Sequence, residues 1–245
     1  MSLPQVRFFV LFFCQLVLVP TANAMTVTPT QIEMTSAGRT SRSAITVVNN
    51  GADALAVELV VKKATLDEAG VPKASSAGDE FLIMPPQALI PPGATQNFRI
   101  QWLGEPLLEK SETFLVYVNQ IPVKLPKRIR GVQVIFGMGV MVNVAPPRGE
   151  PELKVLGSGV VTDARGRRHP TLTVFNPTNV HALFPQSTVR LSSGDWSATL
   201  SSGELAQSIG IGLVQPGHRR RFVLPVVLPP GVTSMQSSLE FRPKP

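Results

Sequence analysis

Most of the chain alternates between short apolar runs and turn residues. Within the runs, apolar side chains recur at every second position, which is the pattern of a strand with one buried face. Helical periodicity is almost absent, and 23 prolines and 19 glycines separate the runs. The pattern therefore predicts an all-β fold. Strands are expected at residues 26–34, 43–48, 54–62, 80–84, 95–102, 113–120, 131–145, 152–161, 169–175, 188–191, 195–200, 219–227 and 237–241.

The longest alternation runs from Gly131 to Ala145. Strands usually have about five or six residues, so this one is more than twice the ordinary length. Its odd positions carry a mixed set that includes Gln133 and Asn143, whereas its even positions are all apolar. Two interpretations stay open: a central core strand, or an edge strand that offers alternate side chains and backbone groups to another protein. The even positions are Val132, Val134, Phe136, Met138, Val140, Val142 and Val144.

A basic segment precedes this strand. It contains Lys124, Lys127, Arg128 and Arg130. These charges could steer or grip an acidic partner. A solvated basic loop also discourages aggregation at a sheet edge, so both interpretations are kept.

Residues 1–24 have the composition of a secretory signal peptide. An apolar run from Phe8 to Val19 is followed by small residues that end at Ala24, where we expect cleavage. The run is too short to cross a bilayer. The mature chain, residues 25–245, has no cysteine. We therefore expect a soluble exported protein, located in the periplasm if the source has two membranes.

The composition also limits the classes of partner and chemistry. The net charge is +7, but Trp102, Trp196 and Tyr117 are the only tryptophans and tyrosine, too few for base stacking, so no nucleic-acid partner is expected. No metal-ligand spacing relates the three histidines, His169, His181 and His218. No glycine-rich phosphate loop is recognisable. We expect a non-enzymatic protein without a metal or a cofactor.

Two short sequences recur in the two halves of the chain. Thr46-Val-Val-Asn-Asn50 resembles Thr173-Val-Phe-Asn-Pro177, and Pro92-Gly93 before one strand resembles Pro216-Gly217 before another. The two pairs occur in the same order at similar spacing. This repetition predicts two related seven-stranded sandwiches of the immunoglobulin type.

At this point the sequence resembles the periplasmic chaperones of the chaperone–usher pilus pathway, the PapD-like proteins. The resemblance covers essentially the whole mature chain. It lies in the order of several blocks: Pro85-Pro86-Gln-Ala-Leu-Ile-Pro-Pro92-Gly93 with Arg99 after it, Glu112-Thr-Phe-Leu-Val-Tyr-Val-Asn-Gln-Ile-Pro122, the basic segment, the long alternating strand and Asn176-Pro177-Thr178.

The resemblance implies two immunoglobulin-like β-sandwich domains in an L or boomerang arrangement, residues 25–146 and 147–245. It implies that the long strand completes pilus subunits that lack their last strand, until an outer-membrane usher receives them. Free protein could hide the strand by self-association. The side chains expected to fill the subunit groove are Val132, Val134 and Phe136, continued by Met138 and Val140, whereas Val142 and Val144 could belong to the protein's own core.

Some positions depart from the better-known members of that family. The Arg and Lys that anchor a subunit's terminal carboxylate correspond here to Gln31 and Met141. Ala145 replaces an Arg that pairs with the equivalent of Glu112 between the domains, and Arg148 is a conjectural substitute. These departures resemble the archaic or alternative branch of the family.

Arg99 could bind a carboxylate in the cleft or form a structural ion pair, with Glu112 as a candidate partner.

The main alternative function is an exported structural or adhesive component of a pilus. Such a component would be expected to carry its own donor extension near the mature N-terminus, where this sequence runs almost directly into a strand.

Overall fold

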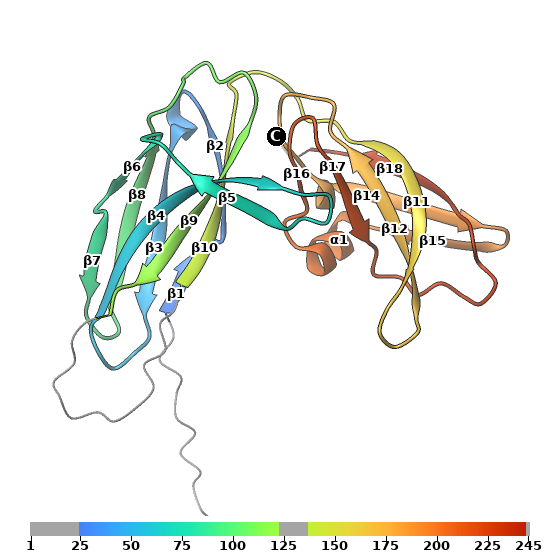
Figure 1. Cartoon of the computed structure of the whole chain (residues 1–245), viewed down its shortest axis with the longest axis horizontal. Helices are drawn as coiled ribbons and strands as arrows, with labels where there is room; N and C mark the ends of the chain where they lie inside the picture. The colour runs from blue at the N-terminus through green and yellow to red at the C-terminus, as the bar shows by residue number, and fades with distance from the viewer. Residues whose placement is uncertain (1–24, 123–136, 244–245) are drawn as a thin grey trace, which may run out of the picture.

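The protein consists of two β-sandwiches, each built around its own hydrophobic core (Figure 1). The computed structural model describes residues 25–122 and 137–243. Figure 1 shows the two sandwiches beside each other at an angle, joined by the segment that follows β10. The expected all-β fold with two immunoglobulin-like domains is thus confirmed.

The first sandwich packs two antiparallel-rich sheets face to face. One sheet has the order β1-β3-β8-β6, and the other has the order β2-β10-β9-β4-β5, with β7 also paired to β4. Alternate residues of both sheets point inward, and Phe98, Phe114 and Ile45 are among the side chains with no exposed surface. The strands are β1 (Met25–Thr28), β2 (Gln31–Thr35), β3 (Arg42–Asn49), β4 (Leu55–Leu66), β5 (Pro72–Ser76), β6 (Phe81–Met84), β7 (Gln87–Ile90), β8 (Thr95–Trp102), β9 (Glu112–Gln120) and β10 (Gly137–Ala145).

The second sandwich has smaller sheets and a short helix. Its sheets have the orders β11-β12-β17, β15-β14-β18 and β13-β16. Phe184 stacks on Phe222 in its core, with ring centroids 4.2 Å apart. The elements are β11 (Lys154–Thr162), β12 (Arg168–Phe175), β13 (Ala182–Leu183), β14 (Ser187–Ser193), β15 (Trp196–Leu200), α1 (Ser202–Ile209), β16 (Leu213–Val214), β17 (Arg219–Val223) and β18 (Gln236–Phe241). A 3-10 turn at Phe184–Gln186 lies between β13 and β14, and another, at Arg39–Ser41, lies between β2 and β3 of the first sandwich.

The repeated Asn and Gly residues occupy equivalent corners of the two sandwiches. Asn49 and Asn176 are both buried. In the first sandwich the Gly93 amide donates to the Asn49 carbonyl at 2.9 Å, and in the second the Gly217 amide donates to the Asn176 carbonyl at 2.9 Å. Both glycines have positive φ, 68° and 71°, a conformation that favours glycine. The sequence repetition therefore reflects a repeated structural corner.

Several expectations from the sequence differ from the structure: strands β5, β7, β13 and β16 were not expected, and two further differences have a local cause. The strand expected at 26–34 is divided into β1 and β2, which belong to different sheets, because Pro29 cannot donate to a strand ladder and the chain changes sheets there. Helix α1 was not expected, although Ser201 and Glu204 form a capping box at its start. It is only eight residues long, so its periodicity gave little signal.

The hairpin of β4 and β5 reaches from the first sandwich to the second (Figure 1). Buried Gln215 receives the Leu66 amide hydrogen at 2.8 Å and donates to the Ala64 carbonyl at 2.9 Å. At the hairpin tip, Glu68 Oε2 lies 3.1 Å from Arg219 Nε. We call this hairpin, residues Leu55–Ser76, the interdomain arm.

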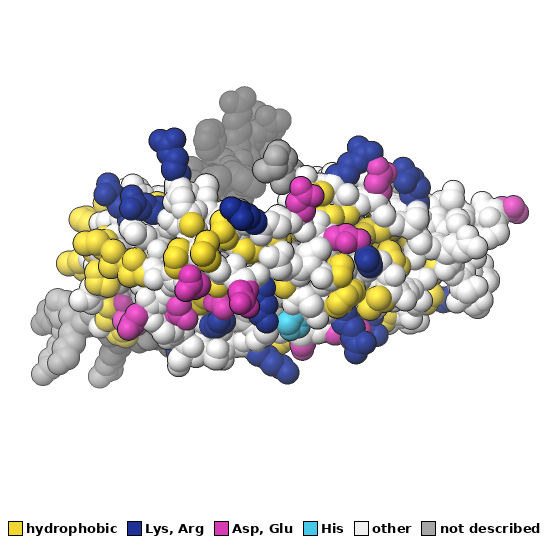
Figure 2. All heavy atoms as spheres, turned by 90° about the horizontal axis from the view of Figure 1, so that it is seen from above, with side chains coloured by type: hydrophobic (Ala, Val, Ile, Leu, Met, Phe, Trp, Pro, Cys, Tyr) yellow, Lys and Arg dark blue, Asp and Glu magenta, His cyan; other side chains and the backbone are white. Residues whose placement is uncertain are grey.

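Charges of both signs are interspersed on the face shown in Figure 2, and hydrophobic side chains gather on it over the first sandwich. Exposed hydrophobic residues of that sandwich include Met84 and Leu89, with 58% and 64% of their surface accessible. Across the described residues, no helix has the length and apolar character needed to span a bilayer.

Candidate functional site

Strand β10 is paired on both sides over only part of its length. On one side β9 pairs with it from Gly137 to Val144. On the other side β2 runs parallel to it and pairs only with Met141 to Ala145. Among the described strands, none pairs with Gly137–Val140 on that second side. We call this stretch the open edge.

The open edge carries backbone groups that point away from the sheet. The Met141 amide donates to the Thr30 carbonyl at 3.0 Å, on the β2 side. Backbone groups alternate in direction along a strand, so the amide and carbonyl groups of Gly139 and Gly137 face the same side as those of Met141. Both glycines are exposed. These backbone groups have no partner strand among the described residues.

The even positions of β10 face the core of the first sandwich. Val140 has 1% of its surface exposed, and Val142 and Val144 have none. Met138 is partly buried and packs against the same core. The expectation that Val140 fills a partner's groove is therefore wrong, because its side chain already fills this protein's own core. Val142 and Val144 lie in that core, as the sequence suggested.

Most of the residues expected to contact a partner lie outside the described residues. These are Val132, Val134 and Phe136 of the apolar stripe, and Lys124, Lys127, Arg128 and Arg130 of the basic segment. The stripe is continuous in sequence with the open edge. Its assignment therefore stays a prediction.

The two positions that correspond to the family's carboxylate anchor lie side by side. Gln31 of β2 and Met141 of β10 are direct partners in the parallel register. Neither side chain is charged, and the Gln31 amide donates to Glu33 Oε1 at 2.7 Å. This pair offers hydrogen bonding and an apolar surface where a cation was expected from the family.

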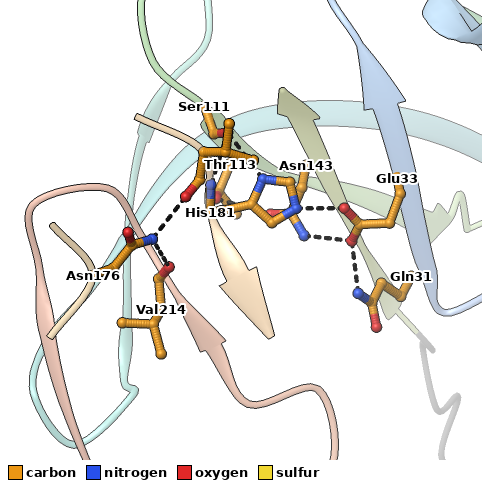
Figure 3. A network of polar contacts seen from close by, with 9 residues as sticks. Gln31, Glu33, Ser111, Thr113, Asn143, Asn176, His181 and Val214 are labelled. Carbon is orange, nitrogen blue, oxygen red and sulfur yellow. Dashed lines mark hydrogen bonds and ion pairs between the residues drawn. The ribbon is translucent and has the colours of Figure 1, made fainter. Parts of the chain in front are cut away.

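Glu33 connects the strand pair to the second sandwich (Figure 3). Its carboxylate accepts a hydrogen bond from Asn143 Nδ2 at 2.8 Å and lies 2.5 Å from His181 Nε2. Asn143 accepts in turn from Thr113 Oγ1 at 2.9 Å. Partial burial raises the pKa of Glu33. The hydrogen bond and the charge of His181, together with the side-chain hydrogen bonds of Asn143 and Gln31, outweigh this effect, so the pKa of Glu33 lies below its usual range.

His181 is held on its other side by Ser111. The His181 backbone amide donates to Ser111 Oγ at 3.0 Å, and His181 Nδ1 lies 3.0 Å from the same oxygen. His181 Nε2 faces the Glu33 carboxylate. The order Ser–His–acid is that of a hydrolase triad, but Ser111 is buried and its oxygen already accepts a backbone hydrogen bond. We assign the network to the junction of the two sandwiches.

The sequence did not identify this network. His181 stood alone in the sequence because its partners are 148 and 70 residues away. Asn143 was noted only as a polar residue on the odd face of the long strand. The one available signal was Asn143, the single polar side chain of β10 (GMGVMVNVA), since Glu33 falls in the alternating strand QIEMT.

The expected pairing of Arg99 with Glu112 is wrong. Arg99 lies on β8 and Glu112 on β9, in opposite sheets. Glu112 Oε1 instead lies 2.7 Å from Lys63 Nζ on the neighbouring strand. This ion pair also replaces the conjectured partner Arg148. Arg99 lines an open pocket of about 700 Å³ on the outer face of its sheet, together with Met84.

Within the described part of the chain, no three His, Cys, Asp or Glu side chains are grouped as metal ligands would be. The residues of the junction network are occupied by hydrogen bonds to one another. The described part of the site presents an open strand edge next to a polar junction between two sandwiches.

Comparisons with known proteins add a family and a fold. A family model described as the pili and flagellar-assembly chaperone, PapD N-terminal domain, matches residues 24–149. No curated protein sequence matches the chain. Among solved structures, the class 5 fimbriae chaperone CfaA is similar with a TM-score of 0.53 at 12% identity, covering 89% of this chain and 100% of that one.

Two other solved structures are similar to the same extent. The YadV chaperone has a TM-score of 0.52 at 15% identity, covering 88% of this chain and 98% of that one. A chain of the Salmonella enterica SafA pilin complex with the SafB chaperone has a TM-score of 0.53 at 15% identity, covering 84% of this chain and 86% of that one. At these identities the structural likeness establishes the fold.

Proposed function

The chain belongs to the family of pili and flagellar-assembly chaperones, whose N-terminal-domain model matches just over half of it, and we propose that it stabilises pilus subunits by donating the strand around Val132–Phe136. A chaperone role in pilus assembly follows from the family. Strand donation and delivery to an outer-membrane usher are the finer steps of the proposal. Cleavage after Ala24 would place the protein in the periplasm.

The observation that carries the proposal is the open edge of β10. Its backbone groups have no partner among the described strands, at the point where the apolar stripe enters the described structure. Adding a strand to such an edge supplies main-chain hydrogen bonds, and the alternate side chains supply specificity. The same strand can thus be anchored in its own sandwich at Val140–Val144 and offer its earlier residues to a partner.

The apolar stripe supplies enough burial for stable capture. Burying a large aliphatic or aromatic side chain contributes roughly 1.5 to 3 kcal/mol. Val132, Val134 and Phe136 would together contribute roughly 5 to 9 kcal/mol before the costs of association. A shift of one residue would turn Gln133 and Gly137 toward the groove instead, so the register is strongly selected.

The basic segment fits an accessory role in this proposal. Four positive charges ahead of the strand would attract an acidic subunit or usher surface and speed encounter at low ionic strength. Residues 25–146 and 147–245 are the proposed extents of the two domains, because the first core includes Val144 and the second begins at Leu153.

The test is co-purification with candidate subunits produced in the same periplasm. The wild-type chain, tagged at its C-terminus, is expected to elute with a small exported partner at one-to-one stoichiometry. Phe136→Glu should abolish this, because a carboxylate cannot be buried in an apolar groove. Gln133→Glu adds the same charge at an odd position and should retain the partner.

Each contrary outcome has a definite meaning. If Phe136→Glu retains the subunit as well as wild type does, the stripe does not fill the groove. If the wild-type chain elutes only as a filament of itself, it is a structural component of a pilus instead of a chaperone.

A further inference from the structure

The odd face of β10 has an unusual composition beside the open edge. Gly139 lies directly opposite Tyr117 of β9, and Tyr117 in turn lies opposite Val60 of β4. Two residues along, Met141 is opposite Leu115. All of these side chains are partly exposed. The face is therefore an apolar platform that ends at a glycine.

Gly139 has no side chain, and the Tyr117 ring borders the space that a side chain at this position would fill. A Cβ atom at this position would lie 3.8 Å from Tyr117 Cε1 and 3.9 Å from Cδ1, which are ordinary contact distances. The tyrosine ring thus lies next to the bare backbone of Gly139. No left-handed conformation requires a glycine here, because the φ of Gly139 is not positive. Apart from this ordinary contact with the Tyr117 ring, no described group borders the position of that Cβ atom.

We propose that Gly139 and Tyr117 form a subsite for one large apolar side chain on the strand that the open edge receives. This rests on the proposed function, since the occupant is the captured pilus subunit. The side chain opposite Gly139 would extend over the glycine backbone and pack against the Tyr117 ring. Aromatic side chains are known to cover glycines on neighbouring strands in this way, and cross-strand aromatic pairs are favourable.

The geometry supports an occupant of that size. Neighbouring strands lie about 4.8 Å apart, so a side chain on the added strand must cross the width of one strand to reach Tyr117. A side chain at position 139 would block that path, and a small residue on the added strand would not span it. The open backbone groups of Gly139 would fix the added strand in register with this contact.

The subsite is tested with Gly139→Val, which fills the space over the edge strand. Gly157→Val is the matched control: Gly157 is exposed on β11 of the other sandwich, and nothing lies within 4 Å of a Cβ placed there. Gly139→Val should keep or raise the melting temperature of the free protein, because valine favours strands and glycine does not. Gly157 lies at a register shift of β11, so capture by the two variants is compared at a temperature where both chains are folded. Only Gly139→Val should weaken capture of the co-purified subunit, by about tenfold or more.

A second measurement locates the occupant on the subunit. Each large apolar residue on the subunit's strands is changed to Ala in turn, and capture by wild type and by Gly139→Val is compared. One position should weaken capture by wild type yet have no further effect on capture by Gly139→Val, as expected for two residues in contact. Tyr117→Ala should also weaken capture, whereas Tyr117→Phe should not.

The outcomes separate this subsite from strand donation. If Phe136→Glu abolishes capture but Gly139→Val captures as wild type does, the subsite is refuted and strand donation stands. If Phe136→Glu has no effect, strand donation fails first. If every large-to-Ala change acts equally on both chains, no side chain occupies the subsite and the inference is refuted.

Discussion

The repeated corner leads to a prediction about the separate stability of the two sandwiches. Asn176 is fully buried, and its side chain donates to the carbonyls of Val180 and Val214 and accepts the Thr178 amide at 2.9 Å. Asn176→Ala leaves these groups without that partner. An unsatisfied buried polar group costs about 1 to 3 kcal/mol. Two or three such groups give roughly 2 to 9 kcal/mol.

Asn49→Ala, the same change at the first corner, should destabilise the protein by a similar amount. Asn49 donates to the carbonyls of Asp53 and Ile90 and accepts the Gly51 amide at 2.9 Å. A loss of roughly 2 to 9 kcal/mol is a large part of the stability of a domain, which is about 5 to 15 kcal/mol. Asn50→Ala is the matched control, because Asn50 is the exposed neighbour.

The two tryptophans allow each sandwich to be followed separately. Trp102 lies in the first core and Trp196 packs against the second. Urea unfolding is measured by fluorescence in single-tryptophan versions, made with Trp102→Phe or Trp196→Phe. Asn49→Ala should lower the midpoint reported by Trp102 most strongly, and Asn176→Ala the midpoint reported by Trp196.

Two results would refute the reasoning. One is a loss below about 1 kcal/mol for either buried Asn, the size expected for a single solvated hydrogen bond. The other is an effect of Asn50→Ala as large as that of its buried neighbour. Either would mean that the corner bonds do not stabilise the sandwiches as the repeated geometry implies.

Two further predictions concern the junction of the sandwiches. Gln215→Ala removes both hydrogen bonds to the interdomain arm. It should lower the free energy of unfolding by about 2 to 3 kcal/mol and separate the two unfolding transitions that the tryptophans report. The exposed control Gln236→Ala should leave both transitions unchanged, and equal effects of the two variants would refute the arm's role. The pKa of Glu33 is lowered in the folded protein, so its contribution to stability is present above the ordinary value of 4.5 and is lost as the pH falls through the lower folded value. Unfolding measured from about pH 6 to pH 3 should show a steeper acid loss for wild type than for Glu33→Gln, and parallel curves would contradict this.

Much of the architecture follows from local patterns. The alternation at residues 95–102 matches β8 (Thr95–Trp102) because one face of that strand is wholly buried and the other is solvated. The recurrence of Asn49 at Asn176 marked equivalent corners because the same Asn and Gly residues recur in the same order at similar spacing. The sequence shows this repetition, although each Asn bonds to residues about 40 positions away.

The face of β10 shows the limit of such patterns. Period two places Val132 to Val144 on one side of a strand, but it does not say where the protein's own sandwich ends. The structure decides that Val140 belongs to the core. The reason is that β9 and β2 cover different lengths of the same strand, and these lengths depend on where Pro29 moves the chain between sheets.

The polar junction depends on tertiary structure alone. The sequence by itself determined most of the strands, the repeated corners and the apolar stripe, because each is set by alternation or by a repeated turn residue, whereas strands β5, β7, β13 and β16 were not expected. Glu33 meets His181 across 148 residues, and Gln215 meets Leu66 across 149. A contact between residues so far apart leaves no periodicity in either segment. Only the packing of one sandwich against the other brings these groups within hydrogen-bonding distance.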